Sequence, residues 1–347
     1  MKINKIFVGL AVIAAVLTSC ENQDVSYPDF DYQTVYFANQ FPSRTVELGE
    51  DLFVDNSIDN QHKVLIKATM GGVYSNTKNI VIDFKVDTSL CSGIYFNSGA
   101  TSGSKVVPMP SNYYQLASNN VTIPAGSILG GVEVQLTDAF FADPKSLVNT
   151  YVIPLLMTSV QGADSILQGT PLVDNPNRCV DADWSVKPRD FILYAVKFVN
   201  PWHGNYLRRG TDQITHADAS VTTSVRHQQY VEDNEVVKIS TNSLTASTLP
   251  LTIKDNSGTS VPFNLVLNFT DDGTCTVSSN SSDFDISGSG KFVSKGEKNS
   301  IGGDDRDALY LDYTVDFKNL NLKYATKDTL VVRDRGIAPE YFTVTKK

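Results

Sequence analysis

Cysteine and histidine are scarce in this chain of 347 residues, which has only four of each. The histidines include no pair at the close spacing typical of zinc sites. Beyond Cys20, the cysteines Cys91, Cys179 and Cys275 are widely spaced and odd in number. They predict at most one bridge in an exported chain and no disulfide framework. We therefore expect neither a metal site nor a cofactor.

Signatures of catalysis are also missing from the chain. It has no Gly-x-Ser-x-Gly elbow of the kind that presents a serine nucleophile. Carboxylates are plentiful, and a glycoside hydrolase needs only two of them about 5–10 Å apart, a separation that a sequence does not reveal. A catalytic glycosidase domain is usually larger than either domain expected below. The sequence therefore predicts that the protein is not an enzyme and has no catalytic residues.

Acidic residues outnumber basic ones: the chain has 38 aspartates and glutamates and 29 lysines and arginines. Its formal net charge is −9. Loss of Lys2 and Lys5 with the leader described next would lower the charge to −11. A surface of this sign repels nucleic acids and anionic lipid headgroups. We expect no nucleic-acid partner and favour a neutral ligand.

Long hydrophobic runs are limited to the start of the chain. Ile6 to Leu17 gives twelve uncharged, mostly apolar residues, whereas a membrane-spanning helix needs roughly 20. This run follows two lysines and ends in Leu17-Thr18-Ser19-Cys20, which is typical of a lipoprotein signal peptide over residues 1–19. Cleavage before Cys20 and acylation of that residue would anchor the chain, since two or more acyl chains hold a protein stably on a membrane. An ordinary secretory signal peptide is the alternative.

What the chain does have throughout is alternation of apolar and polar residues, the period of β-strands. In Ile80-Val81-Ile82-Asp83-Phe84-Lys85-Val86, the residues at even positions are predicted to face a core. Residues 309–317 repeat the pattern with odd positions inward. Residues 263–269 and 274–277 flank Asp272-Gly273 and predict a hairpin. The clearest helix signal is one turn after Asp143, where Pro144 fits the first helical position. We predict an all-β protein.

The alternation lapses between residues 161 and 189, where glycine, proline, aspartate and asparagine predominate. A loop of this length is typical of a boundary region. The length of the chain suggests two domains. We predict a tether over 20–34, a first β-domain over 35–199 that includes the boundary loop, and a second antiparallel β-domain over 200–347. The second domain is expected to be a lipocalin-like barrel or a sandwich.

The first domain resembles a family of immunoglobulin-like domains of unknown function found in glycan-handling lipoproteins of gut Bacteroidetes. The resemblance is carried by motifs in the order and spacing of that family, namely Val35-Tyr36-Phe37-Ala38, Asp55-Asn56-Ser57, Met70-Gly71-Gly72-Val73, Asn112-Tyr113-Tyr114, Ile123-Pro124-Ala125-Gly126-Ser127, Leu136-Thr137-Asp138-Ala139-Phe140-Phe141-Ala142-Asp143-Pro144 and Tyr151-Val152-Ile153-Pro154-Leu155. It implies an immunoglobulin-like β-sandwich over residues 35–160. From about residue 190 the chain resembles a second domain type that often follows the first, through Pro201-Trp202-His203-Gly204-Asn205-Tyr206 and Ser287-Gly288-Ser289-Gly290-Lys291-Phe292.

The resemblance implies a place in a polysaccharide utilisation system. Proteins of this setting are similar to surface glycan-binding subunits, which work beside a porin-like transporter of the outer membrane and its lipoprotein partner. The expected location is therefore the outer membrane, lipid-anchored and facing the cell surface. The expected function is non-catalytic capture of a polysaccharide or oligosaccharide for uptake. No catalytic residue can be carried over, because the family has none established.

Aromatic side chains are the candidates for glycan contact, since a sugar offers an apolar face and a polar rim to an aromatic ring. The candidates are Trp184, Trp202, Tyr113, Tyr114 and Tyr230. Each has a structural alternative: packing at the domain joint for Trp184, plugging of a barrel floor for Trp202, and packing at a strand edge for the tyrosines. A structural or assembly lipoprotein that binds only protein partners is the second functional hypothesis, and a glycoside hydrolase is the third.

Overall fold

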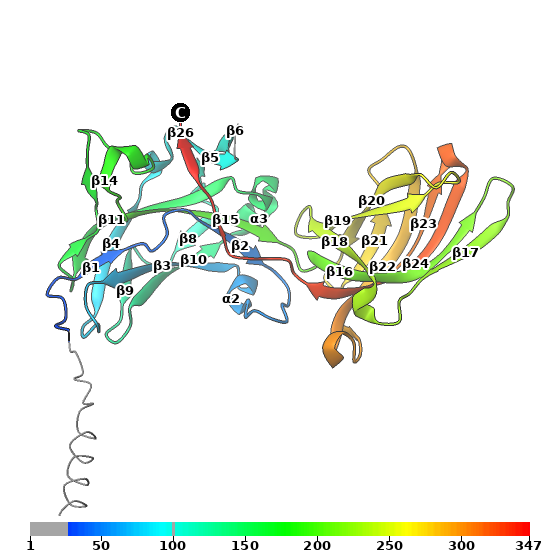
Figure 1. The fold of residues 1–347 in the computed structure, drawn as a ribbon, viewed down its shortest axis with the longest axis horizontal. Coiled ribbons are helices and arrows are strands. Elements are labelled where there is room, and N and C mark those ends of the chain that lie inside the picture. Colours follow the sequence, from blue (N-terminus) through cyan, green and yellow to red (C-terminus); the bar gives the residue numbers. More distant parts are fainter. Residues whose placement is uncertain (1–26, 99–100) are drawn as a thin grey trace, which may run out of the picture.

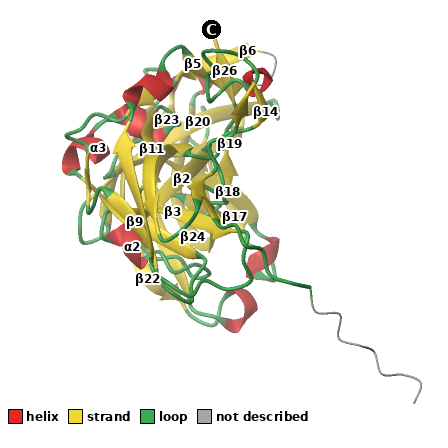
Figure 2. Cartoon of the chain, turned by 90° about the vertical axis from the view of Figure 1, so that its left-hand side faces the viewer, coloured by secondary structure: helices red, strands yellow, loops and turns green. Residues whose placement is uncertain are grey.

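The computed structural model describes residues 27–98 and 101–347, which form two β-rich lobes (Figure 1). The predicted all-β class is confirmed, since strands dominate and helices are short pieces at the periphery (Figure 2). The predicted signal peptide 1–19, the lipidation residue Cys20 and the first part of the tether lie outside the described residues. Within those residues, no helix combines the length and apolar character that crossing a membrane requires.

The first lobe packs two sheets face to face. One sheet has the order β12 (Ser165–Ile166), β1 (Thr34–Tyr36), β3 (Lys63–Gly71), β10 (Leu129–Leu136) and β8 (Tyr114–Leu116). The other has the order β25 (Glu340–Tyr341), β2 (Pro42–Glu47), β15 (Phe191–Val199), β11 (Tyr151–Gln161), β4 (Ile80–Val86) and β9 (Asn120–Ile123), with β7 (Val107–Pro108) beside β11. Short helices α2 (Ser57–Asn60) and α3 (Asp138–Ala142) lie between strands. The fold is thus the sandwich that the sequence predicts.

Alternating side chains build the core between the two sheets. On β4, Ile80, Ile82 and Phe84 are buried as predicted, whereas Val86 at the end of the strand is exposed. They meet Ile66 of β3 and Val134 of β10 in one hydrophobic cluster. Burial of such side chains contributes about 1.5–3 kcal/mol each relative to exposure.

The predicted turn after Asp143 is also present. Pro144–Leu147 forms a single 3₁₀ turn, and the Asp143 carboxylate accepts a hydrogen bond from the Lys145 backbone N–H. The predicted boundary loop 161–189 contains only short strands besides β12, namely β13 (Thr170–Pro171) and β14 (Trp184–Val186), which pair with each other. Arg178 in this loop forms an ion pair with the buried Asp190, which fixes the loop to the start of β15.

The second lobe is a closed antiparallel barrel. Of the two predicted forms, a barrel or a sandwich, the barrel is therefore confirmed. Its strands in chain order are β16 (Gly204–Thr215), β17 (Val221–Arg226), β18 (Glu235–Thr241), β19 (Ala246–Lys254), β20 (Ser260–Phe269), β21 (Thr274–Ser278), β22 (Asp285–Glu297), β23 (Arg306–Phe317) and β24 (Leu322–Asp334). Neighbouring strands pair in sequence from β18 to β24, and β24 closes the ring on β16. The predicted hairpin is β20–β21, where Gly273 adopts a φ of 82°.

One wall of the barrel is split lengthwise. The first half of β16 pairs with β18, and its second half pairs with β17. β19 meets β18 only at Thr248 and Ser247, so its second half is paired with β20 alone. Among the described residues no pairing joins β17 to β19. A seam therefore separates these two strands along the outer half of the barrel.

The chain after the barrel returns to the sandwich. β25 pairs with β2, and β26 (Val344–Lys346) pairs with β5 (Ile94–Ser98), which pairs in turn with β6 (Thr101–Lys105). Phe342 between them is buried and packs against Phe41 and Phe96. The predicted second domain, 200–347, is therefore too long at its C-terminal end. Strands of two or three residues carry no alternation from which this return could be predicted.

Arg335 joins the two lobes. This buried side chain donates hydrogen bonds to the backbone carbonyls of Leu48, Glu50, Asn200 and His203, at 2.7–3.0 Å. Its Nε also lies 3.5 Å from Oε1 of the buried Glu47. Burial raises the pKa of Glu47 to about 7, although the Arg335 charge opposes the shift. One guanidinium thus holds the end of β2, the linker after β15 and the exit of β24 together.

Candidate functional site

Polar side chains occupy inward positions in the outer half of the barrel. Arg208 and Asp212 lie on the face of β16 that also carries Tyr206, and Thr326 and Asp328 lie on the corresponding face of β24. All four are less than 10% exposed. Buried charges are tolerated only when they are paired and hydrogen-bonded. Each of these charged side chains therefore needs a partner within the barrel.

Asp328 is the centre of the cluster. Its carboxylate accepts hydrogen bonds from Arg208 Nε at 2.9 Å, Tyr313 Oη at 3.0 Å and Arg226 Nη2 at 2.5 Å. Because β17 and β24 pair with opposite edges of β16, Arg226 reaches this carboxylate from the seam side of β16. One acidic side chain of β24 therefore binds side chains from three other strands, β16, β17 and β23.

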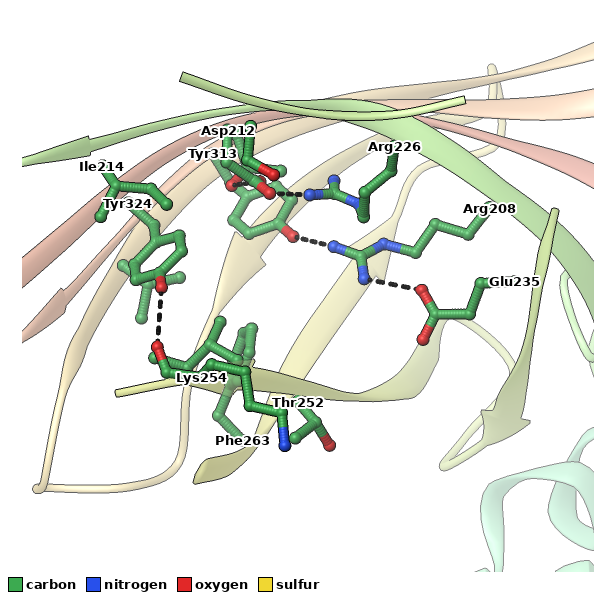
Figure 3. Close-up of a pocket in the computed structure, with 14 residues that line it drawn as sticks. Arg208, Asp212, Ile214, Arg226, Glu235, Thr252, Lys254, Phe263, Tyr313 and Tyr324 are labelled. Atoms are coloured by element: carbon green, nitrogen blue, oxygen red, sulfur yellow. Dashed lines mark hydrogen bonds and ion pairs between the residues drawn. The ribbon is translucent and has the colours of Figure 1, made fainter. Parts of the chain in front are cut away.

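Two further carboxylates complete the network. Asp212 pairs with Arg226 and accepts a hydrogen bond from Thr326 Oγ1 at 2.8 Å. Glu235 of β18, whose side chain is half exposed, accepts from Arg208 Nη1 at 3.2 Å (Figure 3). The Nε of Arg226 is buried and has no hydrogen-bond partner. The two arginines are thus balanced by the buried Asp212 and Asp328.

The absence of a side chain at Gly210 leaves room for the Asp328 carboxylate. A Cβ atom on Gly210 would lie 2.3 Å from Asp328 Oδ1 and from the Lys327 carbonyl oxygen. Gly210 faces Asp328 across the β16–β24 pair, between Arg208 and Asp212. Any side chain at this position would displace the carboxylate that holds both arginines.

The network fixes protonation states. Burial and the neighbouring Asp328 raise the pKa of Tyr313 well above its usual range, so its hydroxyl remains a donor. Burial opposes the positive charge of Arg208, but Asp328 and other neighbours more than offset it, so the pKa of Arg208 is raised. The cluster is therefore a set of fixed donors and acceptors rather than a proton relay.

A cavity of about 380 Å³ lies against this network. Its walls come from seven strands and include Ile214, Ser224, Thr252, Ile253, Lys254, Phe263, Val315 and Tyr324. The Tyr324 hydroxyl donates to the Lys254 carbonyl at 3.1 Å, on the β19 side of the seam (Figure 3). This volume falls in the range of about 300–1,000 Å³ that small-molecule pockets span. Apolar walls with a few convergent polar groups are what such pockets share.

The two tryptophans predicted as candidates lie in the cores. Trp202 is 8% exposed and stacks on Phe269 with 3.9 Å between ring centroids, and its carbonyl accepts from Tyr206 Oη. It plugs the inner end of the barrel, the structural alternative considered above. Trp184 is equally buried, and its indole N–H donates to the Asn177 carbonyl at 2.8 Å. Neither ring offers a free face to a sugar.

The three tyrosine candidates are dispersed. Tyr113 is half-buried in the sandwich and donates to Asp143 at 3.1 Å, and Tyr114 is half-buried on β8. Tyr230 is 60% exposed, in the loop that joins β17 to β18. The structure therefore does not bring the five aromatic candidates together. Cys20 lies outside the described residues.

Fold and site together define a class: a two-lobed, all-β protein with a polar pocket in its barrel. Residues 201–336 match the model of a domain of unknown function (DUF5627), and residues 30–164 match a model described as an N-terminal domain. The chain is 57% identical to a protein of unknown function from Bacteroides ovatus whose crystal structure covers 92% of this chain and 100% of its own, with a TM-score of 0.86. The chain belongs to the same family as that protein.

Two more distant solved structures come from the same genus. An auxiliary nutrient binding protein from Bacteroides thetaiotaomicron is 12% identical over 86% of this chain and 95% of its own, with a TM-score of 0.37. A candidate carbohydrate binding protein from Bacteroides ovatus is 10% identical over 88% of this chain and 99% of its own, with a TM-score of 0.26. Similarity this low carries no argument about the present chain. No protein of curated function matches it.

Proposed function

We propose that this protein is a non-catalytic glycan-binding lipoprotein of the outer membrane, and that the barrel cavity is its ligand site. The observation that carries the proposal is the network of fixed donors and acceptors at that cavity, in which both arginines are paired with carboxylates. A neutral sugar presents hydroxyl groups that both donate and accept, and such groups match carboxylates and guanidiniums already paired with each other. The sugar's C–H face would lie against Tyr324, Phe263 and Ile214, which also line the cavity.

The carboxylates of the cavity favour binding over hydrolysis. A glycosidase needs one carboxylic acid that keeps its proton near neutral pH. Asp212 and Asp328 each form ion pairs with arginine, the geometry of a fixed hydrogen-bond acceptor rather than of a proton donor. Among the described residues, the carboxyl group whose pKa is raised to about 7 is that of Glu47, at the joint between the lobes.

The first test is occlusion of the cavity. Ser224 of β17 lines it, whereas the adjacent Thr223 belongs to the opposite face of the strand. Both are exposed, so a tryptophan at either position should be tolerated. We expect Ser224→Trp to weaken glycan binding at least about tenfold, by displacing ligand volume, and Thr223→Trp to bind as the parent does. Calorimetry of the soluble chain from residue 21 against plant, fungal and host glycans measures this.

Salt supplies an independent check, because binding of an uncharged ligand should change little with ionic strength. Absence of heat with every glycan, or equal binding by the two tryptophan variants, would contradict the proposal. The second candidate, an assembly lipoprotein that binds only protein partners, would then be favoured. Burial of Trp184 and Trp202 is the observation that supports this alternative.

The second test concerns the anchor and the proposed place beside a porin-like transporter and its lipoprotein partner. We expect Cys20→Ser to abolish acylation and to release the protein into the soluble fraction. The reason is that the leader is too short to span a bilayer, and the described residues contain no spanning helix. Cell fractionation with detection of the full chain measures this. Firm membrane association of the variant would show that another feature anchors the protein.

A further inference from the structure

The barrel cavity is closed at its inner end. Below the polar network the barrel is filled by Tyr206, Leu267, Leu309 and Leu330, all at most 2% exposed. Trp202, stacked on Phe269, covers the end that faces the sandwich. A ligand that enters the cavity therefore has no exit in this direction.

Aromatic rings narrow the outer end of the barrel as well. Phe263, Phe284 and Phe317 pack edge to face or tilted, with ring centroids 5.4–6.1 Å apart. Phe317 also contacts Tyr324, with 5.9 Å between centroids. These side chains come from β20, β23, β24 and the connection before β22. With both ends filled, the opening lies in the side of the barrel.

The seam between β17 and β19 is that opening. The cavity is lined by Ser224 and Arg226 on one side of the seam and by three successive residues, Thr252 to Lys254, on the other. Successive residues of a strand point to opposite faces, so the cavity extends around the unpaired edge of β19. At the opening Ser224, Thr252 and Lys254 are polar and exposed, whereas Asp212 and Asp328 of the network are buried.

We propose that this pocket binds the terminal unit of a glycan chain, which enters sideways through the seam; the inference rests on the proposed function. An internal sugar carries a linkage on each side and needs a groove that is open at both ends. A blind pocket of about 380 Å³ admits about one or two sugar units, and only a chain end can reach Asp212 and Thr326 at its base. The rest of the chain remains outside, beside Glu235 and Lys254.

Oligosaccharides of increasing length test the proposal. The probes are linear series from mannan, xylan and starch, from the monosaccharide to the hexasaccharide, titrated calorimetrically into the soluble chain. We expect affinity to rise up to the disaccharide or trisaccharide and then to stay within about threefold, because later units add only exposed contacts. Affinity that continues to rise to the hexasaccharide would overturn the proposal.

The number of glycan chain ends can also be changed while the mass of glycan stays constant. Partial hydrolysis of the polymer that binds multiplies its ends, so the amount of protein bound per gram at saturation should increase in proportion. An unchanged capacity would show that internal segments are bound and would overturn end recognition. Ser224→Trp should lose binding in both assays, and Thr223→Trp should retain it. If no probe binds, or if Ser224→Trp binds normally, the proposed function itself fails, which is a different outcome from binding that depends on chain length.

Discussion

Replacing Asp328 with alanine is expected to destabilise the barrel by about 3–5 kcal/mol, because it removes one partner from a buried ion pair. Arg208, which is 6% exposed, would lose its principal counter-charge. Tyr313 would lose the acceptor of its hydroxyl, and Arg226 would keep only Asp212. Asp312 is a matched control on the neighbouring strand, since its ion pair with Lys327 is exposed. Asp312→Ala should change stability little, because exposed pairs contribute little.

Urea unfolding followed by tryptophan fluorescence measures this effect. The two tryptophans report separate lobes, because Trp202 lies in the barrel core and Trp184 packs beside the sandwich. In a Trp184→Phe background the signal comes from the barrel alone. A loss of stability no greater than that of Asp312→Ala would show that the buried network is not what holds β16, β17 and β24 together.

Replacing Arg335 with alanine is expected to cost about 3–5 kcal/mol as well, but at the joint between the lobes. Each of its four hydrogen bonds to backbone carbonyls contributes about 0.5–1.5 kcal/mol, and the acceptors left behind are partly buried. Glu47 would also remain buried without its nearest cation. Arg335→Lys should fall between the parent and the alanine variant, since one ammonium cannot reproduce the forked geometry of a guanidinium.

Hydrogen exchange locates the effect. Faster exchange is expected at the end of β2, at residues 200–203 and at the end of β24, the three segments that Arg335 joins. Arg333→Ala is the control, because that side chain is more than half exposed and pairs with the adjacent Asp334. Faster exchange confined to β24 in Arg335→Ala would contradict the role of this residue as a link between lobes.

The sequence predicted the parts of the fold that depend on alternation over many residues. β4, β23 and the β20–β21 hairpin follow directly from it, since one apolar face selects one register. The Asp143 turn was predicted because capping is local. The return of the chain to the sandwich could not be predicted, because β25 and β26 are too short for a periodic signal.

The five aromatic residues predicted as site candidates lie outside the polar network of the barrel, so they did not indicate the candidate site. A signal was present in β16 and β24, where Arg208, Asp212 and Asp328 occupy positions that alternation assigns to the core. A charged residue on an otherwise apolar face predicts a buried partner. The identity of that partner was not predictable, because Arg226 and Asp328 are 102 positions apart in the chain.

The course of the chain through the two lobes has a consequence for biogenesis. The barrel is an insertion within the sandwich: β15 precedes it, and β25 and β26 follow it in the same lobe. During synthesis, Phe41 and Phe96 are therefore made well before Phe342, which follows the whole barrel in the chain. Contacts across such a long sequence separation form slowly. The lobe that is translated first is thus the last to be completed.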